Sequence, residues 1–234
     1  MTQVLLIVAD PGDTGGRAAA RAVALPPRSP GGVDHEVVVL SGDELAAARW
    51  SHHVDSAGVA RTSVRLPGRD APVLTDDNLA AVWFRSQQWR VPPGLRAATA
   101  ADAAYARAEL TALLVSWLAS IGPRTVNACD GLSPTGPSWS PARWRQLAAE
   151  HGLPVAGSEG VAVRSVLVAG SHMVGARDTE EHRRCRQLAT AGSCRIVEVG
   201  LDRADRVTGV ATVPSLTGSA QTAAAAAMLQ EVAS

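Results

Sequence analysis

The stretch Leu79-Ala80-Ala81-Val82-Trp83-Phe84-Arg85 decides the predicted fold. Its apolar residues run without interruption and end at an arginine, which is typical of a parallel strand that is covered on both faces. Residues 4–9 form a similar run, and a third run, residues 37–40, follows an Ala- and Arg-rich segment with helical character. The chain therefore predicts an α/β fold in which a small parallel sheet is flanked by helices.

The segments that follow extend this pattern. Leu110, Leu114 and Trp117 lie at helical spacing and predict a long helix with one buried face. Residues 125–126 then predict a short strand. A further helix is expected to begin at Pro141, because proline suits the first turn of a helix. Residues 59–74 are expected to form a hairpin.

The last part of the chain has a different order of elements. The expected elements are a strand pair at 163–169 and 173–174, a helix at 179–191, strands at 194–200 and 207–213, and a helix at 219–232. This order is typical of an α+β arrangement. We therefore predict two domains, an α/β domain of residues 1–157 and a smaller α+β tail of residues 158–234.

Composition excludes several classes of protein. All 22 basic residues are arginine and they balance 22 acidic residues, so neither a nucleic-acid surface nor a polybasic membrane patch is indicated. No apolar run approaches the length of a membrane span. The three cysteines lack paired spacing and are typical of reduced thiols in a cytoplasmic protein. We expect no bound metal and no cofactor.

Arg85 and Arg90 are the first candidates for a binding site. Ligands of open α/β sheets bind beyond the carboxyl ends of the strands, and Arg85 ends the strand that contains Trp83. Two arginines at this place could hold a carboxylate, phosphate or sulfate through bidentate hydrogen bonds. The alternative is a structural Arg85 that stacks on a tryptophan and pairs with Glu109.

Asp130 is the second candidate, as a general base. It follows the strand at residues 125–126 and should face the same sheet edge as Arg85. Thr135, Ser138 and Trp139 could partly remove water from Asp130 and raise its pKa toward the range that general-base chemistry needs. The alternative is an aspartate that caps the turn before Gly131.

Weaker candidates surround these two residues. Residues 12–16 lie between a strand and a helix, where free N–H groups suit an anion, although an ordinary tight turn explains them equally well. Cys129 has no histidine close in sequence that could activate it. The remaining candidates for substrate or anion binding are Thr14, Gly15, Trp83, Asn127, Thr135, Trp139 and Arg143.

Three groups of residues carry a resemblance to a known family. They are Ala81-Val82-Trp83-Phe84-Arg85 with Pro92-Pro93; Tyr105-Ala106-Arg107-Ala108-Glu109-Leu110; and Val126-Asn127 with Gln146-Leu147-Ala148 and Gly152-Leu153-Pro154-Val155. In this order they resemble the pre-ATP-grasp domain of grasp-type peptide maturases and RimK-like ligases. The resemblance implies that residues 1–157 form this domain and that residues 158–234 are a remnant of the grasp C-terminal subdomain.

The chain departs from that family in three ways. It has no lysine, whereas the family holds the nucleotide phosphates with lysines. Val155 is followed almost at once by Arg164–Gly170, which resembles a later grasp strand, so the nucleotide-binding subdomain is expected to be missing. The family's magnesium ligands are replaced by Val199-Gly200-Leu201 and Ala211-Thr212-Val213-Pro214, which offer no carboxylate or asparagine. We therefore expect a protein that does not use ATP.

Two functions remain for such a protein. The first is an enzyme of antibiotic biosynthesis that acts on an amino-acid-derived, carrier-bound substrate. The chain resembles one half of the two-subunit aziridine-forming enzymes of actinomycete azinomycin- and vazabitide-type pathways, which implies ring closure with loss of sulfate and a heterodimeric partner. The second is a non-catalytic subunit that recognises a leader peptide or carrier protein for a separate ligase.

Overall fold

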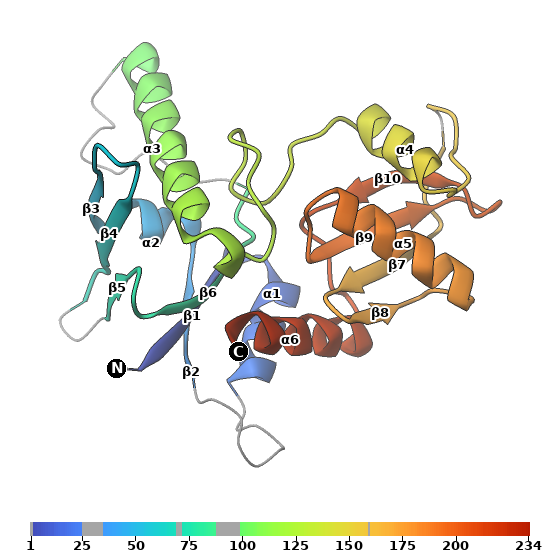
Figure 1. Cartoon of the computed structure of the whole chain (residues 1–234), viewed down its shortest axis with the longest axis horizontal. Coiled ribbons are helices and arrows are strands. Elements are labelled where there is room, and N and C mark those ends of the chain that lie inside the picture. The colour runs from blue at the N-terminus through green and yellow to red at the C-terminus, as the bar shows by residue number, and fades with distance from the viewer. Residues whose placement is uncertain (1, 25–34, 69–71, 88–98, 159) are drawn as a thin grey trace.

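The computed structural model describes residues 2–24, 35–68, 72–87, 99–158 and 160–234 and confirms the mixed α/β fold (Figure 1). The first part of the chain forms a parallel sheet in the order β2-β1-β6, which we call the front sheet. Its strands are β1 (Gln3–Val8), β2 (His35–Leu40) and β6 (Leu79–Phe84). Thr125 pairs with Val82 in parallel orientation, so the predicted strand at residues 125–126 is a single bridge beside β6.

Both faces of this sheet are covered, which explains its uninterrupted apolar sequence. Side chains alternate between the faces of a strand, so Leu5 and Ile7 of β1 belong to one buried cluster and Leu6 and Val8 to another. Two helices cover the first face, α1 (Thr14–Val23) and α6 (Ser219–Ala233). The second face packs against the C-terminal half of α3 (Ala100–Ile121).

A small antiparallel sheet lies beside α3. Its order is β3-β4-β5, from β3 (Arg49–Val54), β4 (Ala60–Arg65) and β5 (Val73–Thr75), and the short helix α2 (Gly42–Ala46) precedes it. The predicted hairpin corresponds to β4 and β5, whereas β3 was not predicted, because its sequence does not alternate. Trp50 of β3 packs edge-on against Trp117 of α3, with 5.1 Å between ring centroids, and this contact holds the sheet to the helix.

The tail contains an antiparallel sheet in the order β10-β9-β7-β8. Its strands are β7 (Arg164–Ala169), β8 (His172–Val174), β9 (Ile196–Leu201) and β10 (Val207–Ala211). One face packs against α4 (Pro141–Glu150) and α5 (Thr179–Ala191). The β7–β8 pair turns at Gly170, as predicted, with φ of +57° at the glycine.

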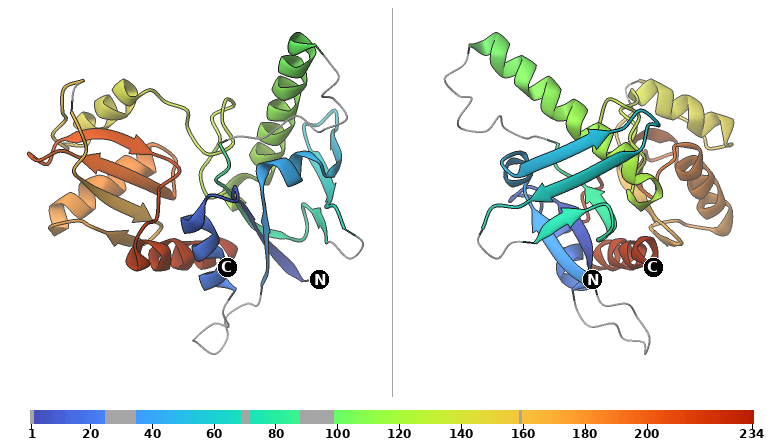
Figure 2. Two further views of the ribbon diagram at one scale, coloured as in Figure 1. Left: turned by 180° about the vertical axis from the view of Figure 1, so that it is seen from behind. Right: turned by 60° about the vertical axis from the view of Figure 1, so that its left-hand side comes forward.

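Helix α6 joins the two sheets. Its buried residues, among them Ala225 and Met228, lie in one hydrophobic cluster with Leu5 of β1 and Leu167 of β7 (Figures 1 and 2). Helix α4 precedes residue 157 but packs with the tail. The division into residues 1–157 and 158–234 remains a prediction. The buried clusters divide the chain differently, because α4 and α6 each pack with elements on the other side of that boundary.

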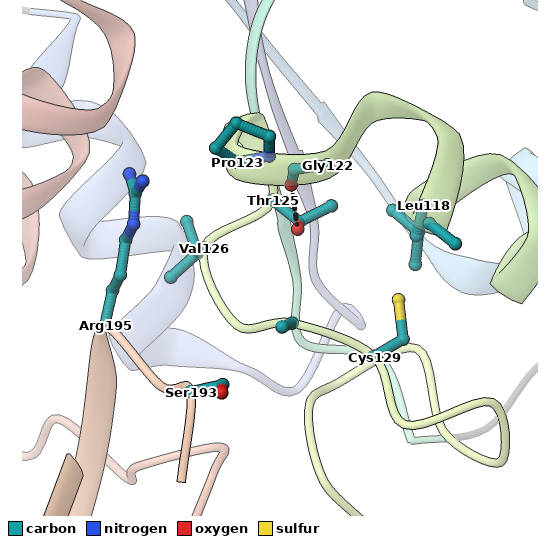
Figure 3. A pocket seen from close by; sticks show the side chains of 10 residues that line it. Leu118, Gly122, Pro123, Thr125, Val126, Cys129, Ser193 and Arg195 are labelled. Atoms are coloured by element: carbon teal, nitrogen blue, oxygen red, sulfur yellow. Dashed lines mark hydrogen bonds between the residues drawn. The ribbon is translucent and has the colours of Figure 1, made fainter. Parts of the chain in front are cut away.

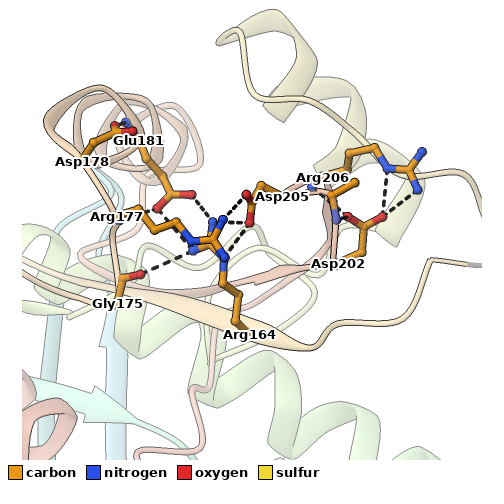
Figure 4. Close-up of polar contacts among 9 residues, drawn as sticks. Arg164, Gly175, Arg177, Asp178, Glu181, Asp202, Asp205 and Arg206 are labelled. Carbon is orange, nitrogen blue, oxygen red and sulfur yellow. Dashed lines mark hydrogen bonds and ion pairs between the residues drawn. The ribbon is translucent and has the colours of Figure 1, made fainter.

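Ion pairs connect β7 and the β9–β10 turn of the tail sheet to α5 (Figure 4). Arg164 of β7 contacts Glu181 of α5 and Asp205 of the β9–β10 turn, with 2.8 Å to the Asp205 carboxylate, and Arg177 also contacts Asp205. Glu181 therefore contributes to a partly buried network. On the solvated face of α5, Arg183 and Arg184 donate hydrogen bonds to Glu180 and lower its pKa to about 2.

We expect Met228→Ala to destabilise the whole chain by about 2–5 kcal/mol, because truncation of a buried methionine leaves a cavity in a packed core. Gln230→Ala, an exposed position on the same helix, is the matched control. Urea unfolding followed by tryptophan fluorescence measures both variants. Loss of stability in only one of the two sheets would contradict the role of α6 as their common core element.

Candidate functional site

Arg85 is buried just beyond the end of β6, where three hydrogen bonds and one stacking contact hold its side chain. Its guanidinium donates two hydrogen bonds to the carboxylate of Asp13, at 2.5 and 2.9 Å, and one to the carbonyl of Pro214, at 2.9 Å. It also stacks on Trp83, 4.5 Å from the ring centroid. The expected stacking on tryptophan is present, but the partner carboxylate is Asp13 and not Glu109.

The turn before α1 is shaped around this ion pair. Asp13 caps the helix by accepting a hydrogen bond from the N–H of Gly16. A Cβ atom at Gly16 would lie 2.5 Å from Nε of Arg85, and one at Gly15 would lie 2.6 Å from the carbonyl oxygen of Ser215. Glycine is therefore required at both positions by close approach of neighbouring chain segments. Gly15, a predicted anion-binding residue, is buried and covered by Ser215.

An open cavity of about 330 Å³ lies beside Arg85, and we call it the strand-end cavity. It is lined by Asp10, Gly12, Asp13, Arg85, Gln87, Val213, Pro214 and Ser215. One carboxylate oxygen of Asp10 accepts a hydrogen bond from Ser86 at 2.7 Å. Nη1 of Arg85 is buried and has no hydrogen-bond partner among the described residues. The cavity thus combines two carboxylates with one guanidinium that retains a free donor.

The loop after residue 127 meets the same sheet edge, as predicted. Leu132, Ser133 and Thr135 of this loop and Ser86 and Gln87 beyond β6 line a second cavity of about 390 Å³, the loop cavity. Two segments that are far apart in sequence therefore lie together at the carboxyl end of β6. Asp130 itself lines neither the loop cavity nor the strand-end cavity.

Asp130 is exposed, and its carboxylate is hydrogen-bonded to residues of its own loop. It accepts hydrogen bonds from the backbone of Leu132 and Ser133 and from both the backbone and the hydroxyl of Ser138. Burial alone would raise the pKa of Asp130, but these hydrogen bonds favour the carboxylate and bring the pKa below its usual value. The expectation of a raised pKa was therefore wrong, and the geometry matches the turn-capping alternative.

Asn127 joins the front sheet to the tail. Its side-chain oxygen accepts hydrogen bonds from the N–H groups of Arg195 and Ile196, both at 3.0 Å. Its amide donates to the carbonyls of Ile196, at 3.0 Å, and Thr212, at 3.1 Å. The side chain is buried, and its donors and acceptor are engaged by backbone groups. In this structure Asn127 connects chain segments, whereas the sequence predicted contact with substrate.

The other predicted site residues are dispersed. Trp83 is in the core, covered by Arg85. Trp139 packs against Trp144 on the tail side, with 4.8 Å between the ring centroids. The guanidinium of Arg143 lies over the Trp139 ring, 5.6 Å from its centroid. Thr14 is exposed in the first turn of α1. Arg90 lies outside the described residues.

Sequence reasoning missed Asp10, Asp13 and Ser215. Asp10 and Asp13 follow the β1 strand directly, so the strand-end rule that selected Arg85 would also have found them. Ser215 had no sequence signal, because a late turn of the tail brings it to the cavity. Glu198 of β9 accepts hydrogen bonds from Ser165 and from both the backbone and the hydroxyl of Ser215.

Neither a metal cluster nor a membrane span is found in the part of the chain that the structure describes. No group of three or more histidine, cysteine and acidic side chains there is placed to hold a metal ion. No helix there is both long enough and apolar enough to cross a membrane.

Asp13→Ala should destabilise the protein by about 3–5 kcal/mol, because it leaves the Arg85 guanidinium buried without its counter-charge. Glu180→Ala removes a carboxylate from a solvated pair on α5 and serves as the control, with a much smaller expected loss. Chemical denaturation at neutral pH measures both. An equal effect of the two substitutions would contradict the structural role of the Asp13–Arg85 pair.

Asp130 should make a pH-dependent contribution to stability. The pKa of Asp130 is lower in the folded protein than its ordinary value of 3.8, so folding favours the carboxylate. The contribution is fully present above that value and disappears as the pH falls through the lower folded pKa. The difference in unfolding free energy between the native chain and Asp130→Ala should therefore be constant above about pH 5 and shrink below about pH 4. A difference that grows on acidification would contradict the hydrogen bonding described above.

No family model and no curated protein sequence matches this chain. Solved structures with a similar fold do exist. An ATP-grasp ligase associated with RiPP biosynthesis from Chryseobacterium gregarium, in complex with ADP and a leader and core peptide, aligns with a TM-score of 0.64 and 10% identity over 96% of each chain. The macrocyclase MdnC from Microcystis aeruginosa, bound with the precursor peptide MdnA, aligns with a TM-score of 0.63 and 9% identity over 95% of this chain and 98% of its own.

The ATP-grasp ligase PsnB, complexed with a minimal precursor, gives a TM-score of 0.59 and 12% identity over 99% of both chains. At this level of identity the likeness concerns the fold and not the activity. The predicted absence of the nucleotide-binding subdomain and of ATP use remains a prediction. The chain has an ATP-grasp-like fold, related to that of peptide-maturing ligases.

Proposed function

We propose that this chain is a protein of natural-product biosynthesis that recognises an amino-acid-derived substrate attached to a peptide or to a carrier protein. The observation that carries the proposal is the strand-end cavity, where unpartnered charged atoms of opposite sign, from Asp10 and Arg85, lie together at the carboxyl end of the parallel sheet. Proteins of similar fold are complexed with leader, core or precursor peptides, which supports an attached substrate.

The charges of the cavity suit a group that carries an amine. Among the described lining residues Asp10 and Asp13 outnumber Arg85, so this part of the lining carries a net negative charge. Asp13 is engaged with Arg85, whereas one oxygen of Asp10 has no hydrogen-bond partner among the described residues. A substrate ammonium group placed at Asp10 would form a charge-assisted hydrogen bond.

Arg85 supplies the complementary contact to an anion. Its Nη1 is buried without a partner, and a buried donor without a partner is unfavourable. An oxygen of a carboxylate, sulfate or phosphate group would satisfy this donor. Because Nη1 is buried, a ligand oxygen reaches it only after a neighbouring side chain moves aside. The cavity then holds an amine and an anion a short distance apart.

This pairing is also what ring closure would require, and it favours aziridine formation as the more specific form of the proposal. Asp10 would first accept one proton from the bound ammonium group, which frees the nitrogen lone pair. The lone pair would attack the carbon that carries a sulfate ester, the C–O bond would break, and sulfate would leave with the bonding electrons. The second proton, released from the ring nitrogen, would go to solvent. Alignment of the two groups contributes to such a reaction without ATP. We assign the carboxylate role to Asp10 because it lines the strand-end cavity, whereas Asp130 does not.

The proposal predicts that an aminoacyl conjugate with a sulfated side chain binds the purified chain, and that Asp10→Asn weakens binding by about tenfold or more, because a charge-assisted hydrogen bond is lost. Asp55→Asn, at an exposed turn aspartate far in sequence from the cavity, is the control. Isothermal titration calorimetry measures the affinities. Absence of binding, or equal loss in both variants, would contradict the proposal.

Sulfate release distinguishes the two forms of the proposal. The same conjugate is incubated with the chain alone and with a candidate partner subunit, and free sulfate is measured by ion chromatography. Release in either sample supports ring closure. Binding without release in both samples rejects ring closure and leaves recognition of an attached substrate as the function.

A further inference from the structure

A third cavity, of about 340 Å³, lies where the end of α3 meets the tail sheet (Figure 3). We call it the junction cavity. Its apolar lining includes Leu118, Pro123 and Val126, and its polar lining includes Cys129 and Arg195. None of its lining residues belongs to the strand-end cavity or to the loop cavity. The proposed function makes no use of it.

Arg195 is the unusual member of this lining. The arginines of the described chain that are at least partly buried are Arg17, Arg85, Arg124, Arg145, Arg164, Arg184 and Arg195. The first six donate a side-chain hydrogen bond to a carboxylate or a backbone carbonyl. The structure gives the Arg195 guanidinium no such partner among the residues that it describes. A partly buried cation without a counter-charge is unfavourable, and an anionic ligand would relieve this.

The backbone of Arg195, in contrast, is fixed. Its N–H donates to the side-chain oxygen of Asn127, and its carbonyl accepts a hydrogen bond from the N–H of Gly170. The side chain therefore projects from a rigid position at the start of β9. Figure 3 shows it along one side of the junction cavity, with Val126 between it and the thiol of Cys129. The fixed backbone sets the point from which the side chain extends, and the planar guanidinium matches a planar anion such as a carboxylate.

We propose that the junction cavity binds a small organic carboxylate with an apolar body, with Arg195 as the carboxylate-binding residue. The guanidinium matches a carboxylate in bidentate geometry, and the side chains of Leu118, Pro123 and Val126 provide an apolar surface for a short aliphatic or aromatic group. Among the described residues Arg195 is the one cation that lines the cavity, which argues against a phosphate. The carboxylate belongs either to a free acid or to the C-terminus of a peptide with an apolar last residue.

Cys129 provides a reporter for ligand binding, because its thiol lines the cavity and it is the cysteine that is not fully buried. Burial raises the pKa of Cys185 and Cys194 to about 12, so both react slowly in the folded protein. The pKa of Cys129 is also raised, first by burial and then by the nearby charge of Asp130, so labelling at mildly alkaline pH is the suitable condition.

The experiment measures the rate of Cys129 alkylation by iodoacetamide in the purified full chain, with Cys129→Ser as the blank. Hexanoate should slow the reaction and hexanamide should not, because the amide has the same apolar body and no charge. Arg195→Gln should bind hexanoate about tenfold more weakly or worse, since a charge-assisted contact is lost. Arg203→Gln, at an exposed arginine of the β9–β10 turn, should behave like the native chain.

A second pair of probes identifies the source of the carboxylate. A short peptide that ends in leucine is compared with the same peptide carrying a C-terminal amide. Protection by the free-acid peptide together with weak protection by hexanoate assigns the site to a peptide terminus, and the reverse assigns it to a free acid. If neither acid slows labelling of the native chain, or if protection persists unchanged in Arg195→Gln, the proposal is wrong. The thermal midpoint of Arg195→Gln shows whether that variant is folded.

Discussion

A buried guanidinium needs hydrogen-bond acceptors and a negative charge around it. For Arg85, two distant segments and its own strand supply these contacts. Asp13 supplies the charge from the turn before α1, Pro214 supplies a carbonyl from the tail, and Trp83 supplies an aromatic face from the strand itself. The two glycines at positions 15 and 16 follow from the same requirement, because the segments approach too closely for a Cβ atom. The ion pair thus fixes the geometry of the sheet edge at which the strand-end cavity opens.

Asn127 and α6 extend this constraint to the whole molecule. Asn127 satisfies backbone groups of β9 and of the turn at Thr212, so the tail sheet is held in register with the end of the front sheet. Helix α6 then fills the space between the two sheets with small and flexible apolar side chains such as Ala225 and Met228. The strand-end cavity and the junction cavity are each lined by residues from both parts of the chain. The shapes of these two cavities therefore depend on how the two sheets meet and not on either sheet alone.

The chemistry of the candidate site could be predicted only in part. The strand-end rule correctly brought Arg85 and the loop after Asn127 to one edge, since parallel strands end on the same side. The rule could not reveal that the carboxylate of Asp130 accepts hydrogen bonds from its own loop. These hydrogen bonds, from Leu132 and Ser138, depend on the conformation of that loop. The rule also gave no means to separate an Arg85 that binds substrate from one that binds Asp13, as both interpretations use the same residue types.

The sequence by itself determined the fold class, most of the helices and the parallel sheet. These depend on local composition: an apolar run covered on both faces, a helical repeat in α3, and capping residues such as Ser140 before Pro141. Only the tertiary structure decided which side chains face one another. Asp13 and Arg85 are 72 positions apart, and Arg85 and Pro214 are 129 apart. Contacts at such separations leave no periodic trace in the sequence, because they arise from the pairing of β1 with β6 and from the return of the tail to the sheet edge, and not from any local preference.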